Sequence, residues 1–145
     1  MEIDDITGVI VDAAVKIHRD LGSDLFESVY ELALAAVLER RGLQVVRQQP
    51  ISFSYEGIEF AHAFRADLVV EGCVLVELKV EDRFSRTHRT QLLTHLRLGR
   101  FPVGLLLNFG AGMMKEGIKR LVNDLPPSDS SPLRVNRPDG HPPAP

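Results

Sequence analysis

Apolar residues recur along the first forty positions at the spacing of amphipathic helices. From Ile3 to Leu21 they fall three or four residues apart, and Gly22 follows. This spacing places them on one side of an α-helix, and a glycine commonly follows a helix end. The same pattern recurs from about Asp24 to Arg41, just before Gly42. We therefore predict two helices at the start of the chain.

After Gly42 the pattern changes to the short apolar runs and alternation of β-strands. Glu56-Gly57 has the composition of a tight hairpin turn between two such runs. The predicted strands are Leu43–Val46 continuing past Pro50 as Ile51–Tyr55, then Ile58–Phe64, 65–70, 74–80 and Val103–Phe109. Further helices are predicted at Thr87–Leu98 and about Lys115–Val122. The order α-α-β-β-β-β-α-β-α predicts an α/β fold with a mixed β-sheet flanked by helices.

The composition changes sharply after residue 125. Residues 126–145 hold seven of the nine prolines of the chain and few residues able to form a core. Such segments do not bury enough apolar surface to fold. We therefore predict one domain over residues 1–125 and a disordered proline-rich tail over residues 126–145.

The remaining composition is that of an ordinary globular protein, with 44% hydrophobic and 26% charged residues. The longest apolar runs, such as Val103–Leu107, are too short to cross a bilayer. Cys73 is the single cysteine, which excludes a disulfide within the chain and disfavours a structural zinc site. The acidic start of the chain lacks a secretory signal pattern. These features predict a cytoplasmic protein without membrane association.

Charged residues interrupt the stretch from Arg65 to Asp82, which otherwise predicts a buried β-hairpin. Pairing even-numbered residues with each other, through a three-residue turn at 71–73, keeps one face wholly apolar. That register sets Asp67 directly opposite Glu77 on the other face. A slip by one residue would mix charge into both faces, so the hydrophobic pattern favours this register.

Two carboxylates held side by side repel each other. A divalent cation between them removes this repulsion and is attracted by both charges, so such a pair favours cation binding. Mg²⁺ prefers oxygen ligands and completes its shell with water and phosphate. Lys79 points the same way as Glu77, where it could orient or deprotonate a water on the ion, or steady a phosphate. The alternative is a set of salt bridges among Asp67, Glu77, Lys79 and Arg65 on a solvated sheet face.

Asp67, followed after nine residues by Glu77-Leu78-Lys79, comes after a helix that carries Glu27. This order resembles the PD-(D/E)XK nuclease superfamily and implies its restriction-endonuclease-like core. The segments IHRDLG, GSDLFESVY, QLLTHL and GLLLNFG further resemble the GxxExxY proteins, a small bacterial family within that superfamily. The resemblance extends from about Ile3 to Val122.

One position departs from the family motif. The motif has glycine three residues before the glutamate, whereas this chain has Asp24 there and Gly22 two residues earlier. Asp24 as N-cap with Glu27 three residues later would also form a capping box, which holds a helix start without chemistry. Both roles are compatible, because a capping glutamate can still face a site. Tyr30, one turn on, is expected to support the site through a hydrogen bond.

The resemblance implies phosphodiester hydrolysis with Mg²⁺, or Mn²⁺ in its place. It implies that Asp67, Glu77 and the backbone carbonyl of Leu78 hold the ion, with Glu27 completing the shell directly or through water. Gln91 lies on the following helix, where many relatives keep a glutamine that positions metal or substrate. The alternative for Gln91 is a plain helix-surface residue.

Three further polar residues are weaker candidates. His95 follows Gln91 by one helical turn and shares its face, so it is a supporting candidate. His18 is expected to be a satisfied structural histidine, and Asn108, between a strand and Gly110, is expected to cap a turn.

The segment from Arg83 to Arg100 is basic although the whole chain has a net charge of −3. It contains five arginines, two histidines and no acidic residue. A local basic patch can follow a phosphate backbone, so Arg83, Arg86 and Arg89 are candidate nucleic-acid contacts. The alternative is a solvated helix face whose arginines cover apolar neighbours.

Two functions remain open at this point. The first is a metal-dependent nuclease, with DNA favoured over RNA as the substrate. The second is a non-cleaving nucleic-acid-binding or homo-oligomeric assembly protein on the same fold. The complete set of Asp67, Glu77 and Lys79 favours the nuclease. The small size of the chain favours a partner or self-assembly, so a homo-oligomer is expected.

Overall fold

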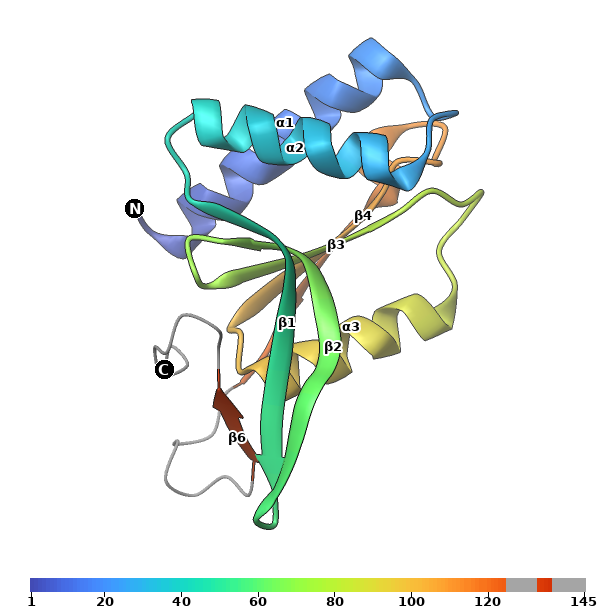
Figure 1. Cartoon of the computed structure of the whole chain (residues 1–145). Helices are drawn as coiled ribbons and strands as arrows, with labels where there is room; N and C mark the ends of the chain where they lie inside the picture. The colour runs from blue at the N-terminus through green and yellow to red at the C-terminus, as the bar shows by residue number, and fades with distance from the viewer. Residues whose placement is uncertain (125–132, 137–145) are drawn as a thin grey trace.

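The structure is a computed structural model that describes residues 1–124 and 133–136 (Figure 1). Its α-helices in these ranges are α1 (Ile3–Leu21), α2 (Glu27–Arg40) and α3 (Arg86–Gly99), with a short 3₁₀ helix, η1 (Met114–Gly117). Its strands are β1 (Val45–Tyr55), β2 (Ile58–Val70), β3 (Val74–Lys79), β4 (Val103–Asn108), β5 (Ile118–Val122) and β6 (Leu133–Asn136). None of the described helices has an apolar stretch long enough to span a bilayer.

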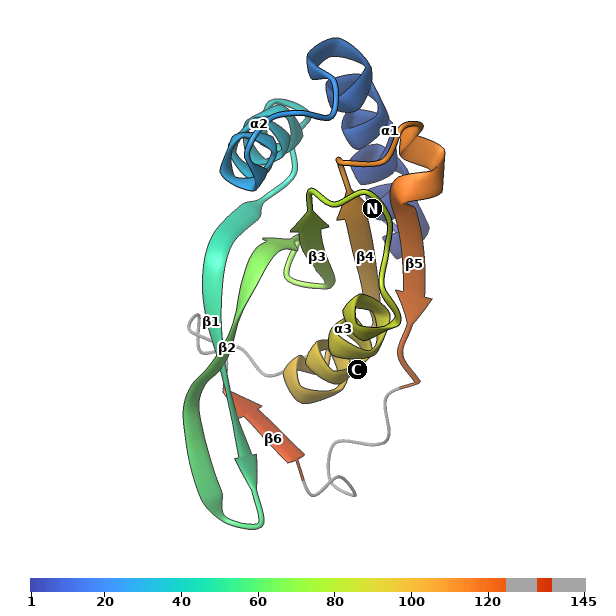
Figure 2. The ribbon, with the colours of Figure 1, turned by 90° about the vertical axis from the view of Figure 1, so that its right-hand side faces the viewer.

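The strands form one mixed sheet in the order β5-β4-β3-β2-β1-β6. β3 and β4 run parallel, joined by a crossover through α3, whereas the other neighbouring strands pair antiparallel. Helices α1 and α2 lie on one side of the sheet and α3 lies on the other (Figures 1 and 2). The predicted α/β fold with a mixed sheet between helices is therefore confirmed.

Two hydrophobic clusters fill the spaces between these layers. The first joins α1 and α2 to one sheet face and includes Val76 and Leu78 of β3. The second joins α3 to the opposite face and includes Leu75 of the same strand. Because both faces of β3 are covered, the strand is buried along nearly its whole length. Gly104 lets α3 approach β4, since a Cβ atom there would lie 2.8 Å from the side chain of Leu96.

The hairpin of β1 and β2 is much longer than the rest of the sheet (Figure 2). Its tip is the predicted two-residue turn, with positive φ at both Glu56 and Gly57. Its register shifts between Ile51 and Phe53, opposite a stretch in which His62 has a φ of 52°. This irregularity bends the hairpin. It also changes the residues of β1 that lie opposite each residue of β2 near the middle of the sheet.

Several predicted element boundaries are corrected by the structure. The separate strands predicted at Ile58–Phe64 and 65–70 are one strand, β2, and β1 continues through Pro50, which pairs with Arg65. The helix predicted at Lys115–Val122 is wrong: η1 and the edge strand β5 occupy this stretch. The helical spacing was misleading because pairing with the open edge of β4 outweighs the local pattern.

The predicted tail at residues 126–145 lies outside the described residues except for Leu133–Asn136. Those four residues form β6 and pair with the Ser52–Tyr55 end of β1. These four residues therefore add one strand to the sheet, beside β1.

Candidate active site

The two acids of the predicted metal site lie at the point where β2 and β3 separate. The paired residues of this hairpin are Leu68 with Val76, Val69 with Leu75 and Val70 with Val74, and the three-residue turn at 71–73 joins the two strands. These pairs confirm the predicted register, and its continuation by one step sets Asp67 opposite Glu77. The backbone N–H of Leu78 donates to Oδ2 of Asp67 at 2.8 Å. The side chain of Asp67 therefore satisfies a strand amide at the end of the ladder.

Glu77 is a buried acid, 5% exposed, on the side of the sheet that α3 covers. One of its carboxylate oxygens is bound by Nδ1 of His95, and the His95 ring stacks on Phe64 with centroids 4.0 Å apart. His95 is thus fixed on one side by an acid and on the other by an aromatic ring. His95 therefore lies directly against one acid of the predicted site.

The expected salt-bridge alternative is not formed by these acids. Among the described residues, the ion pair of Glu77 is with His95, and no ion pair joins Asp67 or Glu77 to Lys79 or Arg65. The sheet face is also not solvated, because α3 covers Glu77. The charged residues of this hairpin therefore need an explanation other than mutual neutralisation.

Glu27 is the first residue of α2, and its position corrects the predicted capping box. The N-cap is Phe26, which makes no side-chain cap hydrogen bond, so α2 begins later than the predicted Asp24. Tyr30, one turn into the helix, is fully buried and stacks on Phe109. Its hydroxyl donates to the carbonyl of Gly22 and accepts from the N–H of Leu25 at 3.3 Å. Tyr30 therefore holds the loop that leads into Glu27 and does not bond to the acids themselves.

The electrostatic environment links Glu27 to the acids of the sheet. Burial raises the pKa of the Glu27 carboxyl, the nearby Asp67 carboxylate raises this pKa further, and the Lys79 ammonium lowers it. Burial likewise raises the pKa of Asp67, while the N–H of Leu78 lowers it and the charges of Glu31 and Glu77 raise it. These acids are thus close enough to disfavour each other's charge, and Lys79 is the cation beside them.

Three residues around Asp67 form a polar network that the sequence did not indicate. Glu31 on α2 is 5% exposed, and its Oε2 accepts from Arg47 Nη2 at 2.8 Å and Arg47 Nε at 3.2 Å. Its Oε1 accepts from Gln48 Nε2 at 2.5 Å, and the same nitrogen lies 3.4 Å from Asp67 Oδ1. Glu31 follows Glu27 by four residues, so helical spacing could have pointed to it. No comparable signal marked Gln48.

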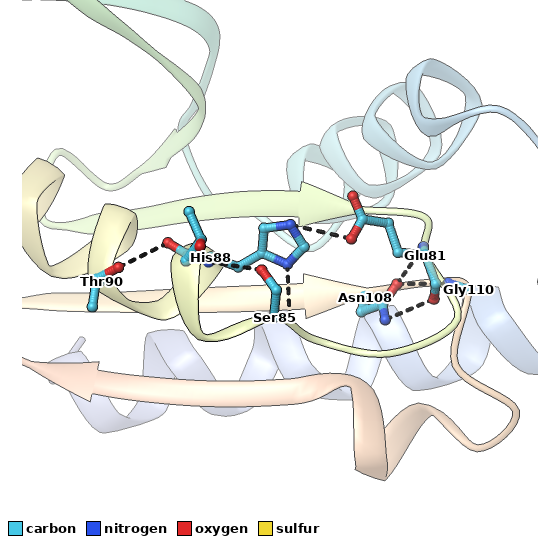
Figure 3. Close-up of polar contacts among 7 residues, drawn as sticks. Glu81, Ser85, His88, Thr90, Asn108 and Gly110 are labelled. Atoms are coloured by element: carbon cyan, nitrogen blue, oxygen red, sulfur yellow. Dashed lines mark hydrogen bonds and ion pairs between the residues drawn. The ribbon is translucent and has the colours of Figure 1, made fainter.

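The loop leaving β3 is fastened to the end of β4 (Figure 3). Oδ1 of Asn108 accepts from the N–H groups of Glu81 and Gly110, and its Nδ2 donates to the carbonyl of Glu81. A Cβ atom at Gly110 would lie 2.4 Å from that carbonyl oxygen, so only glycine allows this approach. Asn108 is therefore a turn-fixing residue, as predicted, and it holds the chain just after Lys79.

A second contact joins this loop to the start of α3 (Figure 3). His88 Nε2 lies 3.1 Å from Oε2 of Glu81, and its Nδ1 accepts from the N–H of Ser85 at 3.3 Å. Ser85 is the N-cap of α3 and accepts from the N–H of His88. These bonds set where α3 begins, one residue earlier than predicted.

The remaining predicted residues lie around this centre. Arg83, Arg86 and Arg89 are exposed in the loop before α3 and in its first turns. Gln91 is exposed one turn before His95, and no hydrogen bond joins it to the acids in the described part of the chain. His18 bonds through Nε2 to the carbonyl of Ala111 at 2.7 Å, the structural role predicted for it.

An Asp and a Glu-x-Lys set on adjoining strands of a mixed sheet, with helices on both faces, is consistent with the restriction-endonuclease-like class of α/β proteins. The chain belongs to the PD-(D/E)XK nuclease superfamily, whose family model matches residues 4–121. Comparison with curated proteins and with solved structures gave no match. Membership suggests nuclease activity on nucleic acid, and nucleases of this superfamily generally depend on divalent metal ions.

Proposed function

We propose that this chain hydrolyses phosphodiester bonds of nucleic acid with a divalent ion at Asp67 and Glu77. The observation that carries the proposal is the register that sets Asp67 opposite Glu77 at the end of the β2–β3 ladder, with Lys79 two residues further along β3. Burial and neighbouring carboxylates also raise the pKa of Asp67 and of Glu27. Acids gathered in this way are destabilised as long as they are charged and lack a cation. A divalent ion would relieve that repulsion, so the donor set suits one.

The ligand set would need a local rearrangement before it held an ion. In the described residues, no three His, Cys, Asp or Glu side chains already converge as a metal site. Oδ2 of Asp67 is held by the Leu78 amide, and Glu77 is held by His95. The second oxygen of Glu77 and the remaining lone pairs of Asp67, whose Oδ1 lies 3.4 Å from Gln48 Nε2, are hard oxygen donors of the kind that Mg²⁺ and Mn²⁺ prefer. We place Asp67, Glu77 and the Leu78 carbonyl in the ligand set, with Glu27 direct or through water.

The protein groups of the site would divide the work of hydrolysis. A bound divalent ion supplies a nucleophile at neutral pH and stabilises charge on the phosphate. Lys79 follows Glu77 by two residues and its charge lowers the pKa of Glu27, so its ammonium would steady the phosphate or orient the attacking water. Tyr30 would keep Glu27 in place by fixing the loop before it. His95 holds one oxygen of Glu77 in the metal-free protein, and Gln91 would contact metal or substrate from the same face of α3.

We further propose that the chain is a GxxExxY protein located in the cytoplasm. The spacing of Glu27 and Tyr30 supports this branch, because the structure gives the tyrosine a distinct role at the loop before Glu27. Asp24, where the motif has glycine, is exposed and is not the helix N-cap. The departure from the motif therefore leaves the position of Glu27 unaffected.

DNA is the favoured substrate, and the start of α3 is its proposed contact surface. Arg83, Arg86 and Arg89 are exposed there, and the N-terminus of a helix carries partial positive charge that attracts phosphate. The loop that carries Arg83 follows Lys79 by only a few residues. A phosphate backbone bound along these arginines would thus lead toward Lys79.

The direct test is a nuclease assay on the purified chain. Single- and double-stranded DNA and RNA would be incubated with Mg²⁺, with Mn²⁺ and with a chelator, beside Lys79→Ala. Cleavage that requires the ion and falls in Lys79→Ala supports the proposal. Equal cleavage by Lys79→Ala would assign the activity to a contaminant or to another site.

Self-assembly without cleavage is the second candidate function, and one surface favours it. The outer side of α2 and the residues before it expose apolar side chains: Leu25, Phe26, Val29 and Leu32, with Phe26 83% exposed. Positions 29 and 32 of α2 fall on the helical face opposite the buried one, and Leu25 and Phe26 lie just before the helix. Sedimentation of wild type and Leu32→Lys would test this. A concentration-dependent dimer that the substitution abolishes, in a chain that binds the ion but cuts nothing, would favour assembly.

A further inference from the structure

Gln48 occupies an unusual place in the sheet beside Asp67. The pairs Arg47 with Leu68 and Gln49 with Ala66 flank it, so the register sets Gln48 directly across from Asp67. That pair itself is missing from the ladder, because Gln48 has a φ of 51°, in the left-handed region. A residue with a side chain is strained there, and such strain within a strand is a reason to look for function.

The strained backbone coincides with a bridging side chain. Nε2 of Gln48 lies 2.5 Å from Oε1 of Glu31 and 3.4 Å from Oδ1 of Asp67. The buried Glu31 is fixed in turn by the guanidinium of Arg47, through two nitrogens on its other oxygen. The amide of Gln48 is therefore held by a salt-bridged acid while it reaches the proposed metal ligand.

Asp67 consequently has a protein donor at each oxygen. The Leu78 amide donates to Oδ2 and the Gln48 amide lies beside Oδ1. Two donors from different strands fix the plane of a carboxylate, which otherwise rotates about its last bond. A fixed carboxylate presents its remaining lone pairs in one direction, which is what an ion with strict coordination geometry requires.

We propose that Gln48 is a positioning residue that orients Asp67 for the divalent ion, with the Glu31–Arg47 pair as its anchor. This inference rests on the function proposed above. According to this inference, the backbone of Gln48 is strained in the left-handed region because only that conformation brings its side-chain amide to Asp67. The competing explanation is that Gln48 only ties β1 to α2 and contributes to the stability of the fold.

The change Gln48→Gly separates these explanations. Glycine adopts the left-handed region without strain, so the substitution removes both the strain and the amide. Positioning predicts that the thermal midpoint of the metal-free chain holds or rises while Mn²⁺ affinity falls about 10- to 100-fold, as for lost supports of metal ligands. Both are measured on the full chain, by calorimetric titration with Mn²⁺ and by thermal unfolding with chelator.

Gln44→Gly is the matched control, because Gln44 is exposed and lies just before β1 without a positive φ. It should slightly lower the midpoint and leave Mn²⁺ affinity unchanged. Affinity of Gln48→Gly within twofold of wild type, or a midpoint several degrees lower, would overturn the inference. A wild type that binds no Mn²⁺ would instead remove the proposed function, and the inference with it.

Discussion

His95 on α3 and Glu77 on β3 bind each other through Nδ1 and a carboxylate oxygen, so a buried acid of the proposed metal site already has a protein partner. A metal ion that takes Glu77 as a ligand must compete with this histidine. The strength of metal binding therefore depends on α3, although Asp67, Glu77, Leu78 and Glu27 all lie on other elements.

Removal of His95 should lower the stability of the metal-free protein and increase the stabilisation that a bound metal ion provides. His95→Ala leaves Glu77 buried without its donor, which is expected to cost about 1–3 kcal/mol of unfolding free energy. Mn²⁺ should then raise the thermal midpoint of the variant more than that of wild type, because the ion has no competitor at Glu77. Thermal scans with and without Mn²⁺ measure both effects. Thr94→Ala, an exposed neighbour on α3, is the control, and equal responses in all three proteins would contradict the prediction.

Asp67→Asn should abolish ion binding without harming the metal-free fold. Asparagine keeps an oxygen that accepts from the Leu78 amide. It removes the negative charge of Asp67, which the charges of Glu31 and Glu77 repel. We expect an unchanged or higher thermal midpoint at neutral pH and no calorimetric signal on titration with Mn²⁺. Asp24→Asn, at an exposed position, is the control. A loss of several kcal/mol of metal-free stability would show that the charge of Asp67 has a structural partner.

The raised pKa of Asp67 and of Glu27 predicts the pH dependence of metal-free stability. A carboxyl whose folded pKa is raised binds its proton more tightly in the folded state than in the unfolded state. Its stabilising effect is complete below the unfolded pKa of about 4 and is lost as pH rises through the folded pKa. Unfolding free energy with chelator should therefore fall as pH rises through that window. Asp67→Asn should show a smaller fall, whereas an equal fall would assign the effect to other groups.

Lys79→Ala should separate ion binding from chemistry. The ammonium is no metal ligand, so Mn²⁺ affinity should be kept or slightly raised, while cleavage should fall by about 100-fold or more. Calorimetry and a fluorescent cleavage assay on the same preparations give the two numbers. Lys16→Ala on the distant helix α1, where Lys16 pairs with Asp20, should change neither. Full activity of Lys79→Ala would exclude this lysine from the reaction.

Arg86→Ala and Arg89→Ala should weaken nucleic-acid binding in a salt-dependent manner. Each lost phosphate contact should make the slope of log affinity against log salt shallower by about one. Fluorescence anisotropy on a labelled oligonucleotide, at several salt concentrations and with chelator, measures this slope. Mn²⁺ affinity should not change, and Arg19→Ala on α1 is the control. An unchanged slope in both variants would favour the plain solvated helix face.

The central hairpin could be predicted from sequence, whereas the partner of Asp67 on β1 could not. Alternation of apolar residues in β2 and β3 specifies one register, so the opposition of Asp67 and Glu77 followed from residue types alone. The turn at Glu56-Gly57 was equally clear. However, if the pairing of β1 and β2 next to this turn continued without a shift, Val46 would lie across from Asp67. The irregularity around His62 shifts the register, and Gln48 takes that place.

Helix boundaries failed where tertiary contacts outweigh local signals. Asp24 has the chemistry of an N-cap, yet the loop before Glu27 is set by Tyr30, a buried residue farther along the chain. The stretch Ile118–Val122 has apolar residues at helical spacing, yet it pairs with β4. Tyr30 is held by its stack on Phe109 and Ile118–Val122 by its pairing with β4, so tertiary contacts decide both cases.

The three-residue turn between β2 and β3 also determines when the acids meet during folding. A hairpin with so short a connection closes in about 1–10 μs, before β4 can pair with β3 through the crossover that contains α3. We therefore expect the carboxylates of Asp67 and Glu77 to approach each other before Glu27 and His95, which belong to separate helices, are in place. Their repulsion then acts on the folding barrier. We expect Asp67→Asn to speed refolding in stopped-flow measurements and to leave the unfolding rate nearly unchanged.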